Sequence, residues 1–432
     1  MGRQLPEHVS MKRPLNLLFA TDATFRRGSD GEVLTDCALW APVWRRYLSA
    51  FDQMMVVGRE QPPNRAPSLA TVADAPGVDF ALLPNVNGLA QTRNRPRVHR
   101  ELSALVQQAD AVVAVLPTEM GLQASSLARK MGKPLLVEVV GSGYEAFSMH
   151  GSLLATCYAP VMHLRMARAV RTADVALYVT QSWLQSQYPS PNRPLEWLDN
   201  EVTPAATPEP GYIQAGVPDV IVSMPDEGVI GRRGIRNAEL AQGRPPVFGT
   251  VASLTPRFKG IQFALAALSR LAAEGAQFQY RVLGPGDPRP WQAIIAQLGL
   301  TNFCFLDGAV DPGQPVLDWL DGIDVHVQPS LTESLSRSTI EALSRGVACT
   351  ASSAGGLPEY LPPDWLHRPG DAAELGAHLR QLIESPSRVV DLSEDSLRRV
   401  RRFDPRLIDG RRQFLYRHLA RLCEGPMKEA RL

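Results

Sequence analysis

The sequence of 432 residues has few cysteines and no arrangement of them that would bind zinc or build a disulfide framework. The five cysteines are scattered and odd in number, with no CxxC pair and no Cys/His cluster at metal-binding spacing. We therefore expect buried thiols in a protein of a reducing compartment. The five are Cys37, Cys157, Cys304, Cys349 and Cys423.

Long apolar runs and an excess of one charge are also missing. No run approaches the ~20 apolar residues that a membrane span needs. The first residues, MGRQLPEHVSMKRP, lack the apolar core of a signal peptide. The formal net charge is only +1, which gives no reason to expect a nucleic acid as partner. These absences predict a cytoplasmic protein and leave open a peripheral contact with the inner face of the plasma membrane.

What the chain does contain is a repeated alternation of strands and helices. Short apolar runs that end in turn residues predict parallel strands covered on both faces. They are residues 15–22, 51–58, 109–117, 133–141 and 173–180 in the first half, and 246–254, 278–286, 302–308, 323–330 and 347–356 in the second. Helical patterns separate them, and one of these ends at Gly132 as a C-cap would. The alternation predicts an α/β protein with doubly wound parallel sheets.

A stretch rich in proline, glycine and acidic residues separates the two halves, at about residues 189–246. We place the linker near its end, at about 239–246. The predicted domains are therefore an N-terminal Rossmann-like domain at 1–238, a C-terminal Rossmann-like domain at 239–395, and a helical tail at 396–432. Two such domains face each other across a cleft, and ligands bind beyond the carboxyl ends of the strands.

The residues after the strand at 323–330 carry the strongest sign of chemistry. Glu333 and Glu341 are eight residues apart, with SLSRSTI between them. Ser334, Leu335 and Ser336 suit a loop that enters a helix, with a serine near the cap position. Backbone N–H groups at such a helix start favour a phosphate. Two carboxylates beside them can accept hydrogen bonds from sugar and ribose hydroxyls, which together predicts a site for a diphosphate sugar.

This segment resembles the signature of glycosyltransferase family 4 (glycosyl transferases group 1), a family with the two-domain GT-B fold. The signature residues are Pro329, Ser330, Glu333, Glu341, Ala342 and Gly346. The resemblance continues in Gly355, Gly356, Pro358 and Glu359, in Lys259 and Gly260, in LGPG at 283–286 and in LDGAV at 306–310. Segments GSGYEAF and ALYVTQSWLQSQYP resemble the acceptor-domain segments of bacterial capsule and exopolysaccharide transferases.

The resemblance implies a role for each matching residue. Glu341 would bind the ribose, Glu333 the donor sugar, and Lys259 the diphosphate. The segment from Asp307 to Val310 would contact the base, and the loop of Gly355 and Gly356 the sugar.

The implied reaction is the metal-independent, retaining transfer of a hexose from a UDP-, GDP- or dTDP-linked sugar to a hydroxyl of a lipid-linked glycan. Such a transfer would serve cell-surface polysaccharide synthesis. No residue has a clear claim to be the general base.

The sequence departs from the family pattern at two positions, one of which would touch phosphate. The family's phosphate-binding arginine is replaced by Ser253. Arg257 is either its substitute or a solvated loop residue, and Arg337 is expected on the surface of its helix.

The family's histidine after the strand at 133–141 is absent, because Val140, Gly141 and Ser142 stand there. The nearest histidine, His150, is expected to be a plain loop residue.

In the N-terminal half, Gly28 and Gly31 would form the glycine-rich loop that approaches the donor phosphate, or else an ordinary turn. Glu138, inside a predicted strand, is expected to be paired in the core. The aspartates of DGID, Asp321 and Asp324, look like a metal-binding pair, but Asp324 begins a strand. We therefore predict no catalytic metal.

Three segments are basic, and two of them have more than one interpretation. APVMHLRMARAVR (His163, Arg165, Arg168, Arg171) and APVWRRYL (Trp44, Arg45, Arg46) are either solvated helix faces or faces resting on anionic lipid. The arginine-rich tail is expected to be a helix that crosses back to the first domain.

Two other functions remain open at this point. One is a binding or scaffold subunit that kept the fold and lost activity, which the missing arginine and histidine would favour. The other is a sugar-nucleotide epimerase of the same architecture. Retention of both glutamates and Lys259 favours the transferase.

Overall fold

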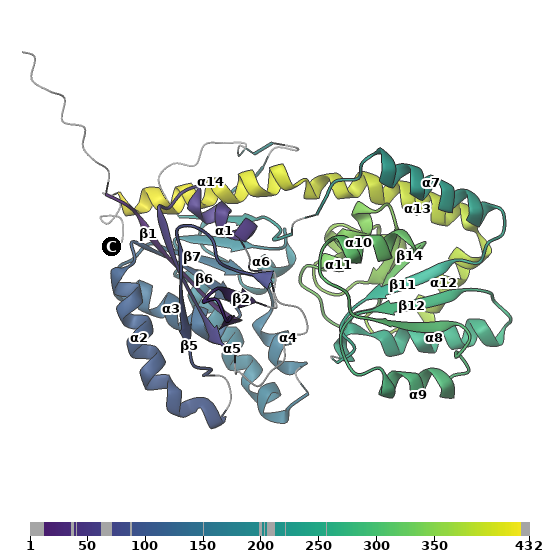
Figure 1. The fold of residues 1–432 in the computed structure, drawn as a ribbon, viewed down its shortest axis with the longest axis horizontal. Helices are drawn as coiled ribbons and strands as arrows, with labels where there is room; N and C mark the ends of the chain where they lie inside the picture. The colour runs from purple at the N-terminus through teal and green to yellow at the C-terminus, as the bar shows by residue number, and fades with distance from the viewer. Residues whose placement is uncertain are drawn as a thin grey trace, which may run out of the picture. The chain divides into compact units, whose positions relative to one another are not determined.

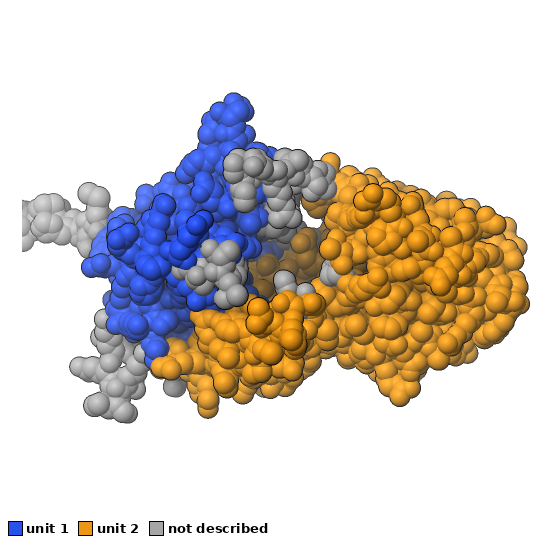
Figure 2. Space-filling view, turned by 90° about the horizontal axis from the view of Figure 1, so that it is seen from below, with its two compact units in different colours: residues 1–137, 173–175, 413–432 blue, residues 138–172, 176–412 orange. Residues whose placement is uncertain are grey.

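The structure is a computed structural model that describes residues 13–35, 39, 41–61, 71–86, 89–149, 151–197, 201–202, 204, 212–220, 222–255 and 257–424. Cys37 and His150 lie outside these residues. The chain forms two compact units, coloured blue and orange in Figure 2. Unit 1 comprises residues 1–137, 173–175 and 413–432, and unit 2 comprises residues 138–172 and 176–412.

Unit 1 is built on a mainly parallel sheet. Its parallel strands are β1 (Asn16–Arg27), β3 (Gln53–Glu60), β5 (Val78–Leu83) and β6 (Ala111–Leu116), and β2 (Val33–Thr35) and β4 (Thr71–Val72) extend it antiparallel. Its helices are α1 (Ala41–Leu48), η1 (Leu89–Asn94), α2 (Arg95–Gln108) and α3 (Glu119–Lys130). The predicted strands at 15–22, 51–58 and 109–117 are confirmed. Gly132 has a φ of 63°, as a helix C-cap requires.

The first strand is longer than its apolar pattern predicts. β1 continues past Asp22 to Arg27, with a register irregularity between Ala20 and Thr24. Gly28 and Gly31 therefore lie in the turn of the β1–β2 hairpin, where Gly28 N–H donates to the carbonyl of Glu32 at 2.8 Å. The polar residues after Thr21 hid this extension, because hydrophobic pattern alone cannot detect a half-exposed strand.

Helix α1 is not a basic surface face. Trp44 and Arg46 are buried, and the Trp44 indole N–H donates to the carbonyl of Ala73 at 2.8 Å. Only Arg45 of the three residues is exposed. Both interpretations of this segment, as a solvated or a lipid-facing surface, are therefore wrong.

Strands β7 (Leu135–Val139) and β8 (Val175–Tyr178) have residues in both units. In unit 2 they continue to β10 (Ile213–Gly216) and β9 (Arg193–Pro194). The helices that accompany them are α4 (Gly143–Ser148), α5 (Leu153–Arg171) and α6 (Trp183–Gln187). Glu138 is buried and lies 3.6 Å from the guanidinium of Arg412, which confirms its expected pairing in the core.

The rest of unit 2 is a second doubly wound sheet of six parallel strands in the order β13-β12-β11-β14-β15-β16. The strands are β11 (Val247–Val251), β12 (Gln279–Leu283), β13 (Cys304–Gly308), β14 (Val325–Gln328), β15 (Ala348–Ser352) and β16 (Leu366–His367). All five strands predicted in this half are confirmed. The order reverses direction between β11 and β14, and this switch point is where ligands of such sheets bind.

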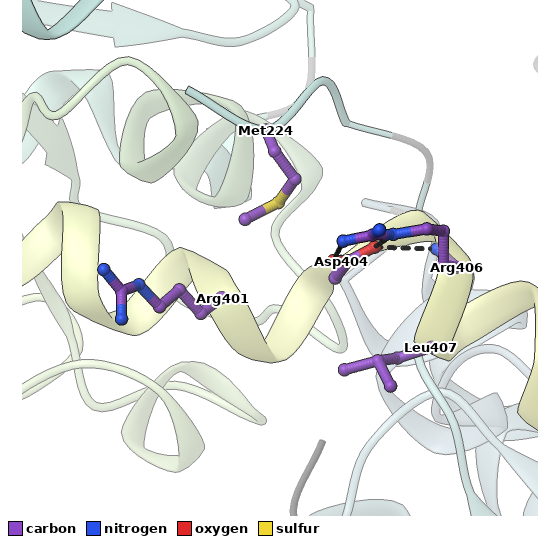
Figure 3. Close-up of a pocket in the computed structure, with 5 residues that line it drawn as sticks. All are labelled: Met224, Arg401, Asp404, Arg406 and Leu407. Carbon is purple, nitrogen blue, oxygen red and sulfur yellow. Dashed lines mark hydrogen bonds and ion pairs between the residues drawn. The ribbon is translucent and has the colours of Figure 1, made fainter. Parts of the chain in front are cut away.

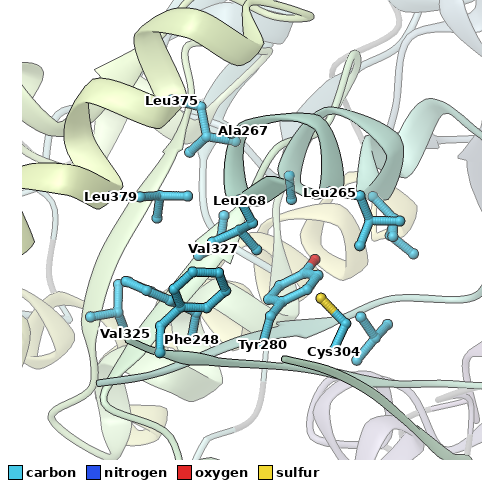
Figure 4. Close-up of a cluster of buried hydrophobic side chains, with 14 of the residues drawn as sticks. Phe248, Leu265, Ala267, Leu268, Tyr280, Cys304, Val325, Val327, Leu375 and Leu379 are labelled. Carbon is cyan, nitrogen blue, oxygen red and sulfur yellow. The ribbon is translucent and has the colours of Figure 1, made fainter. Parts of the chain in front are cut away.

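Helices lie on both faces of this sheet. Figure 1 shows α8 (Ile261–Ala273) and α9 (Arg289–Gln297) on one face, and α10 (Gln314–Asp321) and α11 (Arg337–Ser344) on the other. The remaining elements are η2 (Arg257–Lys259), η3 (Leu357–Glu359), η4 (Pro363–Trp365), α12 (Ala372–Glu384), α13 (Pro386–Arg399), η5 (Val400–Phe403) and α14 (Pro405–Cys423). Figure 4 shows the core under α8, where Phe248, Leu268 and Tyr280 are almost fully buried.

A helix lies within the stretch at 189–246 that was predicted to separate the two halves, and its end overlaps the predicted linker at 239–246. α7 (Glu227–Ala241) is capped by Asp226, whose side chain accepts from the N–H of Val229 at 2.8 Å. Its buried Arg233 donates to the carbonyls of Leu320 and Ile323, which ties α7 to the second sheet. Three glycines in this helix weaken its apolar periodicity, so the sequence pattern did not reveal it.

The chain ends in unit 1. There the ring of Tyr416, on α14, stacks on the ring of Tyr47 with 4.3 Å between centroids. No helix in the described part of the chain has the length and apolar character needed to cross a membrane. Of the described cysteines, Cys304 and Cys349 are buried as expected, whereas Cys157 is exposed, so the expectation of buried thiols is wrong for that residue.

Candidate functional site

The loops that follow β11 and β14 are held together at the switch point of the second sheet. Gly260 has a φ of 78°, and a Cβ there would lie 1.8 Å from the carbonyl oxygen of Pro329. The N–H of Leu331 donates to the carbonyl of Phe258 at 2.7 Å. Only a glycine allows this approach, and it brings the end of η2 beside the loop that carries Glu333.

Lys259 and Glu333 form an ion pair at this point. The Lys259 Nζ atom lies 2.8 Å from Glu333 Oε2, and the two side chains are 26% and 11% exposed. The same carboxylate oxygen lies 3.4 Å from the hydroxyl of Ser330 and 3.5 Å from the amide nitrogen of Gln328. A partly buried lysine next to a carboxylate supplies both a positive charge for a phosphate and an acceptor for hydroxyls.

Polar side chains below the carboxylate hold it in place. Gln328 donates to Ser330 at 2.8 Å and accepts from Ser338 at 3.0 Å. His326 lies 3.2 Å from the same Gln328 amide oxygen. This buried network continues from β14 into α11 and fixes the loop between them.

Helix α11 begins as predicted. Ser336 is its N-cap, and its hydroxyl accepts from the N–H of Thr339 at 3.4 Å. The Ser336 N–H itself donates to the Tyr360 hydroxyl at 3.1 Å, so this one of the three predicted phosphate donors has a protein partner. Ser334 and Leu335 lie half-buried in the loop before it.

The glycine pair after β15 packs on the backbone of Glu333 and Ser334. Gly355 has a φ of 60°, and a Cβ there would lie 1.3 Å from the Glu333 carbonyl oxygen. Gly356 donates its N–H to the same carbonyl at 3.3 Å, and its own Cβ would lie 2.4 Å from the Ser334 carbonyl. Neither position tolerates a side chain, so these glycines determine where Glu333 lies.

Glu341 lies further along α11 and is half-buried. Burial raises the pKa of its carboxyl group, and the positive charge of Arg337 opposes this effect. Arg337 is exposed, which confirms its expected place on the helix surface. A half-buried carboxylate without a fixed partner can accept hydrogen bonds from vicinal hydroxyls.

Asp307 is a fixed carboxylate. It accepts from Arg281 Nε at 2.9 Å and from the indole N–H of Trp319 at 2.7 Å. Because the side chain is engaged, contacts with a base would come from the backbone of residues 307–310. Val310 lies half-buried at the end of this segment.

The position of the missing phosphate-binding arginine is filled by a small side chain. The Ser253 hydroxyl donates to the carbonyl of Pro285 at 3.2 Å. The guanidinium of Arg257 is exposed and lies 5.7 Å from the ring centroid of Trp291, a cation–π contact. Arg257 is thus two residues from Lys259 on η2, and its guanidinium lies against Trp291.

Sequence reasoning missed Glu145. It lies in α4, after the carboxyl end of β7, and its carboxylate accepts a hydrogen bond from the hydroxyl of Thr332, next to Glu333. Its pKa is raised first by burial and also by the negative charge of Glu333, while the bond from Thr332 lowers it. The only available sign was its place after a strand end, since the contact joins residues 187 apart.

Glu359 also has a role that its motif did not reveal. Its carboxylate accepts from the backbone N–H groups of Gln181, Ser182 and Trp183 at 2.7, 2.9 and 2.8 Å. It therefore satisfies the free N–H groups at the start of α6.

Two of the pockets in unit 2 are defined by the residues that line them. One, of about 510 Å³, adjoins Glu145 and is lined by Ser142, Tyr144, Glu145, Pro160, His163, Leu164, Trp183 and Gln187. The other, of about 520 Å³, is shown in Figure 3 and is lined by Met224, Arg401, Asp404, Arg406 and Leu407. The second contains none of the predicted residues, and its Arg406 is paired with Asp404 at 2.8 Å.

Aspartates that resembled a metal site are engaged by arginines. Asp324 is buried and accepts from Arg236 and Arg244 at 3.0 and 2.9 Å, and Asp321 pairs with Arg345. This confirms the structural interpretation of Asp324. In the described part of the chain, no group of three His, Cys, Asp or Glu side chains could hold a metal ion. Gly28 and Gly31 lie in unit 1, and every other predicted site residue lies in unit 2.

Residues 245–385 match the family described as glycosyl transferases group 1. Protein CapJ of Staphylococcus aureus is 23% identical over 344 residues, 79% of this chain and 80% of CapJ. The amylovoran biosynthesis glycosyltransferase AmsK of Erwinia amylovora is 29% identical over 150 residues, 33% of this chain and 37% of AmsK.

A solved structure, Anabaena HepE in complex with UDP-glucose, has a TM-score of 0.59 at 15% identity, covering 93% of this chain and 98% of HepE. At that identity the likeness shows the fold alone.

Proposed function

We propose that this chain, a glycosyltransferase of the GT-B fold with a glycosyl transferases group 1 domain at residues 245–385, moves a hexose from a nucleoside diphosphate sugar to a hydroxyl of a glycan acceptor. The transfer retains the anomeric configuration and uses no metal. The observation that carries the proposal is the Lys259–Glu333 ion pair at the switch point of the second sheet, 2.8 Å between Nζ and Oε2.

When the donor binds, the ion pair separates and each of its two side chains contacts a different part of the donor. The Lys259 ammonium turns to the diphosphate, whose negative charge grows as the glycosidic bond breaks. The Glu333 carboxylate then accepts from hydroxyls of the donor sugar. In the reaction the bond from the anomeric carbon to the diphosphate oxygen breaks, and a bond to the acceptor oxygen forms on the same face. The acceptor proton passes to the leaving phosphate oxygen.

The other residues complete the donor site. Glu341 accepts from the ribose hydroxyls, and the backbone of residues 307–310 contacts the base. The N–H groups of Ser334 and Leu335 and the backbone of Gly355 and Gly356 contact the sugar and its phosphate, whereas the N–H of Ser336 stays bonded to the Tyr360 hydroxyl. By the family resemblance, the β1–β2 turn with Gly28 and Gly31, in unit 1, would correspond to the glycine-rich loop that contacts the donor phosphate.

Arg257 is the candidate for the missing phosphate contact at Ser253. Its place on η2, two residues before Lys259, supports this role, and its cation–π contact with Trp291 supports the alternative of a surface residue. Removal of the Arg257 charge, followed by a measurement of donor binding, distinguishes the two roles. Loss of a phosphate contact in Arg257→Ala should weaken donor binding about tenfold, whereas loss of a surface residue should leave it unchanged.

The acceptor is a lipid-linked glycan in cell-surface polysaccharide synthesis. AmsK, whose name assigns it to amylovoran biosynthesis, supports the pathway class. The complex of HepE with UDP-glucose supports a nucleotide-sugar donor. In this proposal the N-terminal domain at 1–238 binds the acceptor and the C-terminal domain at 239–395 binds the donor. The helical tail at 396–432 belongs with the N-terminal domain.

The experiment is slow donor hydrolysis. The purified chain is mixed with a panel of UDP-, GDP- and dTDP-sugars, and free nucleotide is followed without and with membrane extract as acceptor source. We expect nucleotide release from one donor class. This release should be lost in Glu341→Ala and kept in the control Arg289→Ala, which replaces an exposed arginine paired with Asp287. Binding without turnover on any donor would instead make the chain a scaffold subunit. Full turnover in Glu341→Ala would remove the site assignment.

A further inference from the structure

Helix α5 exposes a row of large apolar side chains. Leu153, Leu154, Val161 and Leu164 are 81%, 69%, 46% and 68% exposed. The spacing places them on one side of the helix. We call these four residues the α5 apolar face. Exposed apolar side chains gathered on one side of a helix, next to basic residues, are typical of helices that lie at a membrane interface.

The core of unit 2 does not account for this face. The opposite side of α5 carries the residues that pack inward: Ala159, Met162, Met166, Ala169 and Val170 are all buried. α5 is therefore apolar on its inner side from Ala159 to Val170 and on its outer side from Leu153 to Leu164. An ordinary surface helix has a polar outer side, so the outer leucines have a purpose other than folding.

The second half of the helix is basic. Arg165, Arg168 and Arg171 follow the apolar face, and no carboxylate occurs among the nineteen residues of α5. Arg168 and Arg171 are exposed. Since the whole chain has a net charge of only +1, this charge is local.

We propose that the α5 apolar face is a docking surface for an anionic lipid bilayer. The leucines enter the boundary between headgroups and acyl chains, while the arginines at the other end of the helix reach lipid phosphates. The long arginine side chains can lie along the surface with their guanidinium groups among the headgroups. Tyr144, which is 47% exposed, and Trp183 line the nearby pocket of about 510 Å³ that contains Glu145. Aromatic rings of this kind favour the membrane interface.

A second copy of the chain fits this surface less well. The face runs from Leu153 to Leu164, about 16 Å at 1.5 Å per residue, on a helix about 10 Å wide. The resulting area, on the order of 160 Å², is far below the roughly 800 Å² that each partner contributes to a stable interface. A bilayer needs no complementary shape, so a narrow apolar row next to positive charge suffices.

The docking surface adjoins the candidate active site, and this part of the inference rests on the proposed function. Pro160 and Leu164 line the pocket of about 510 Å³ that also contains Glu145. Glu145 in turn accepts from Thr332, next to Glu333. A lipid-linked acceptor held in the bilayer at α5 could therefore place its sugar in this pocket, beside the donor.

Vesicle binding tests the surface without any enzymatic reaction. The full chain is sedimented with vesicles of pure phosphatidylcholine and with vesicles in which about a third of the lipid is phosphatidylglycerol. We expect binding mainly to the anionic vesicles, weakened at least tenfold in the double variant Leu153→Ser/Leu154→Ser, whose two residues do not line the pocket. In Arg168→Gln/Arg171→Gln the preference for phosphatidylglycerol and the dependence on salt should disappear.

The matched control is Ile230→Ser/Ile235→Ser. Both isoleucines are exposed on α7, at 49% and 63%, and should not contribute to vesicle binding. Cys157 is exposed on the same helix and can carry an environment-sensitive fluorophore after Cys37 and Cys423 are replaced by serine. Anionic vesicles should shift its emission to the blue, and brominated lipid should quench it.

Three outcomes would overturn the proposal. They are no binding by the wild-type chain, equal binding by Leu153→Ser/Leu154→Ser and wild type, and loss in the control double variant equal to the loss in the α5 variant. A wild-type dimer that dissociates in Leu153→Ser/Leu154→Ser, without vesicle binding, would assign the face to a second copy. Donor hydrolysis in the absence of vesicles, measured on the same proteins, keeps the two proposals apart. It should be unchanged in the α5 variant, and its absence from every protein would count against the proposed function only.

Discussion

The ammonium of Lys259 and the carboxylate of Glu333 neutralise each other across 2.8 Å, although their residues are 74 positions apart in the chain. Both side chains are partly buried, so neither charge is fully screened by water. The pair places opposite charges side by side at the switch point between β11 and β14. A diphosphate sugar can replace each half of the pair, since its phosphates suit the ammonium and its hydroxyls suit the carboxylate.

The first prediction concerns this pair. Lys259→Ala removes the only ammonium bonded to Glu333 among the described residues and leaves the carboxylate next to an anionic donor. We expect donor affinity to fall roughly 100-fold, because a hydrogen bond to a charged group is lost and a repulsion is added. Titration calorimetry with the nucleotide sugar measures this loss. Lys259→Ala/Glu333→Gln should recover part of the affinity, and equal loss in the single and double variants would contradict a coupling between the two residues.

A second prediction concerns the glycine behind Glu333. Gly355→Ala puts a Cβ 1.3 Å from the Glu333 carbonyl oxygen, so the loop must move in addition to adopting a left-handed alanine. The matched control is Gly275→Ala, where φ is 90° and a Cβ meets nothing within 4 Å. Backbone strain alone should lower the free energy of unfolding of the control by about 1–2 kcal/mol.

Gly355→Ala should cost more stability than the control and should lower donor hydrolysis to about a hundredth or less, since a 1 Å displacement at a reacting site has such an effect. Urea unfolding and nucleotide release measure the two quantities. Equal hydrolysis by the two alanine variants would show that the position of Glu333 is not critical.

The third prediction separates affinity from stability at Glu341. Burial raises the pKa of this carboxyl group. A raised folded-state pKa means that stability is fully present below the unfolded pKa and is lost as pH rises through the folded pKa. Glu341→Gln should therefore raise the melting temperature at neutral pH, and this gain should vanish in acid.

The same substitution should weaken nucleoside diphosphate binding about tenfold, because an amide is a poorer acceptor than a carboxylate for ribose hydroxyls. Binding of the deoxyribose dTDP should suffer less than binding of UDP. An identical loss for both nucleotides would argue that Glu341 does not contact the ribose 2′ hydroxyl.

Much of the second sheet was predictable because its strands are buried on both faces and are almost continuously apolar. Capping preferences predicted a serine near the start of the following helix, and Ser336 is the N-cap of α11. Resemblance to a known family then directed attention to Lys259 and Glu333. Their ion pair was not predicted, because it depends on how closely Gly260 approaches Pro329.

Three features could not be predicted from the sequence, each for a physical reason. Glu145 contacts Thr332 across 187 positions, and no local pattern records so distant a partner. Trp44 and Arg46 have the composition of a surface face, but tertiary packing buries both. The glycines of α7 obscure its periodicity, although its Arg233 is held by three backbone carbonyls.

The last prediction concerns the buried histidine under the site. His326 is fully buried, with a ring nitrogen 3.2 Å from the Gln328 amide oxygen, and burial lowers the pKa of its imidazole to about 4. A lowered folded-state pKa means that the unfolded chain binds the proton first. Stability is therefore fully present above the unfolded pKa of 6.5 and is lost as pH falls toward about 4. The loss from this residue amounts to about 3 kcal/mol at 1.36 kcal/mol per pKa unit.

His326→Gln keeps a donor for Gln328 and cannot be protonated in this range. Urea unfolding at a series of pH values should show a smaller fall in the free energy of unfolding for this variant than for the wild type. Between pH 6.5 and 4, the slope of that fall should correspond to about one bound proton fewer than in the wild type. Part of the wild-type fall should remain, because burial also lowers the pKa of His367 to about 4. His99→Gln, on the exposed side of α2, controls for the loss of a surface histidine. If the His326→Gln and wild-type curves ran parallel from neutral pH to pH 4, His326 would not be the group that couples acid to the network of Gln328, Ser330 and Glu333.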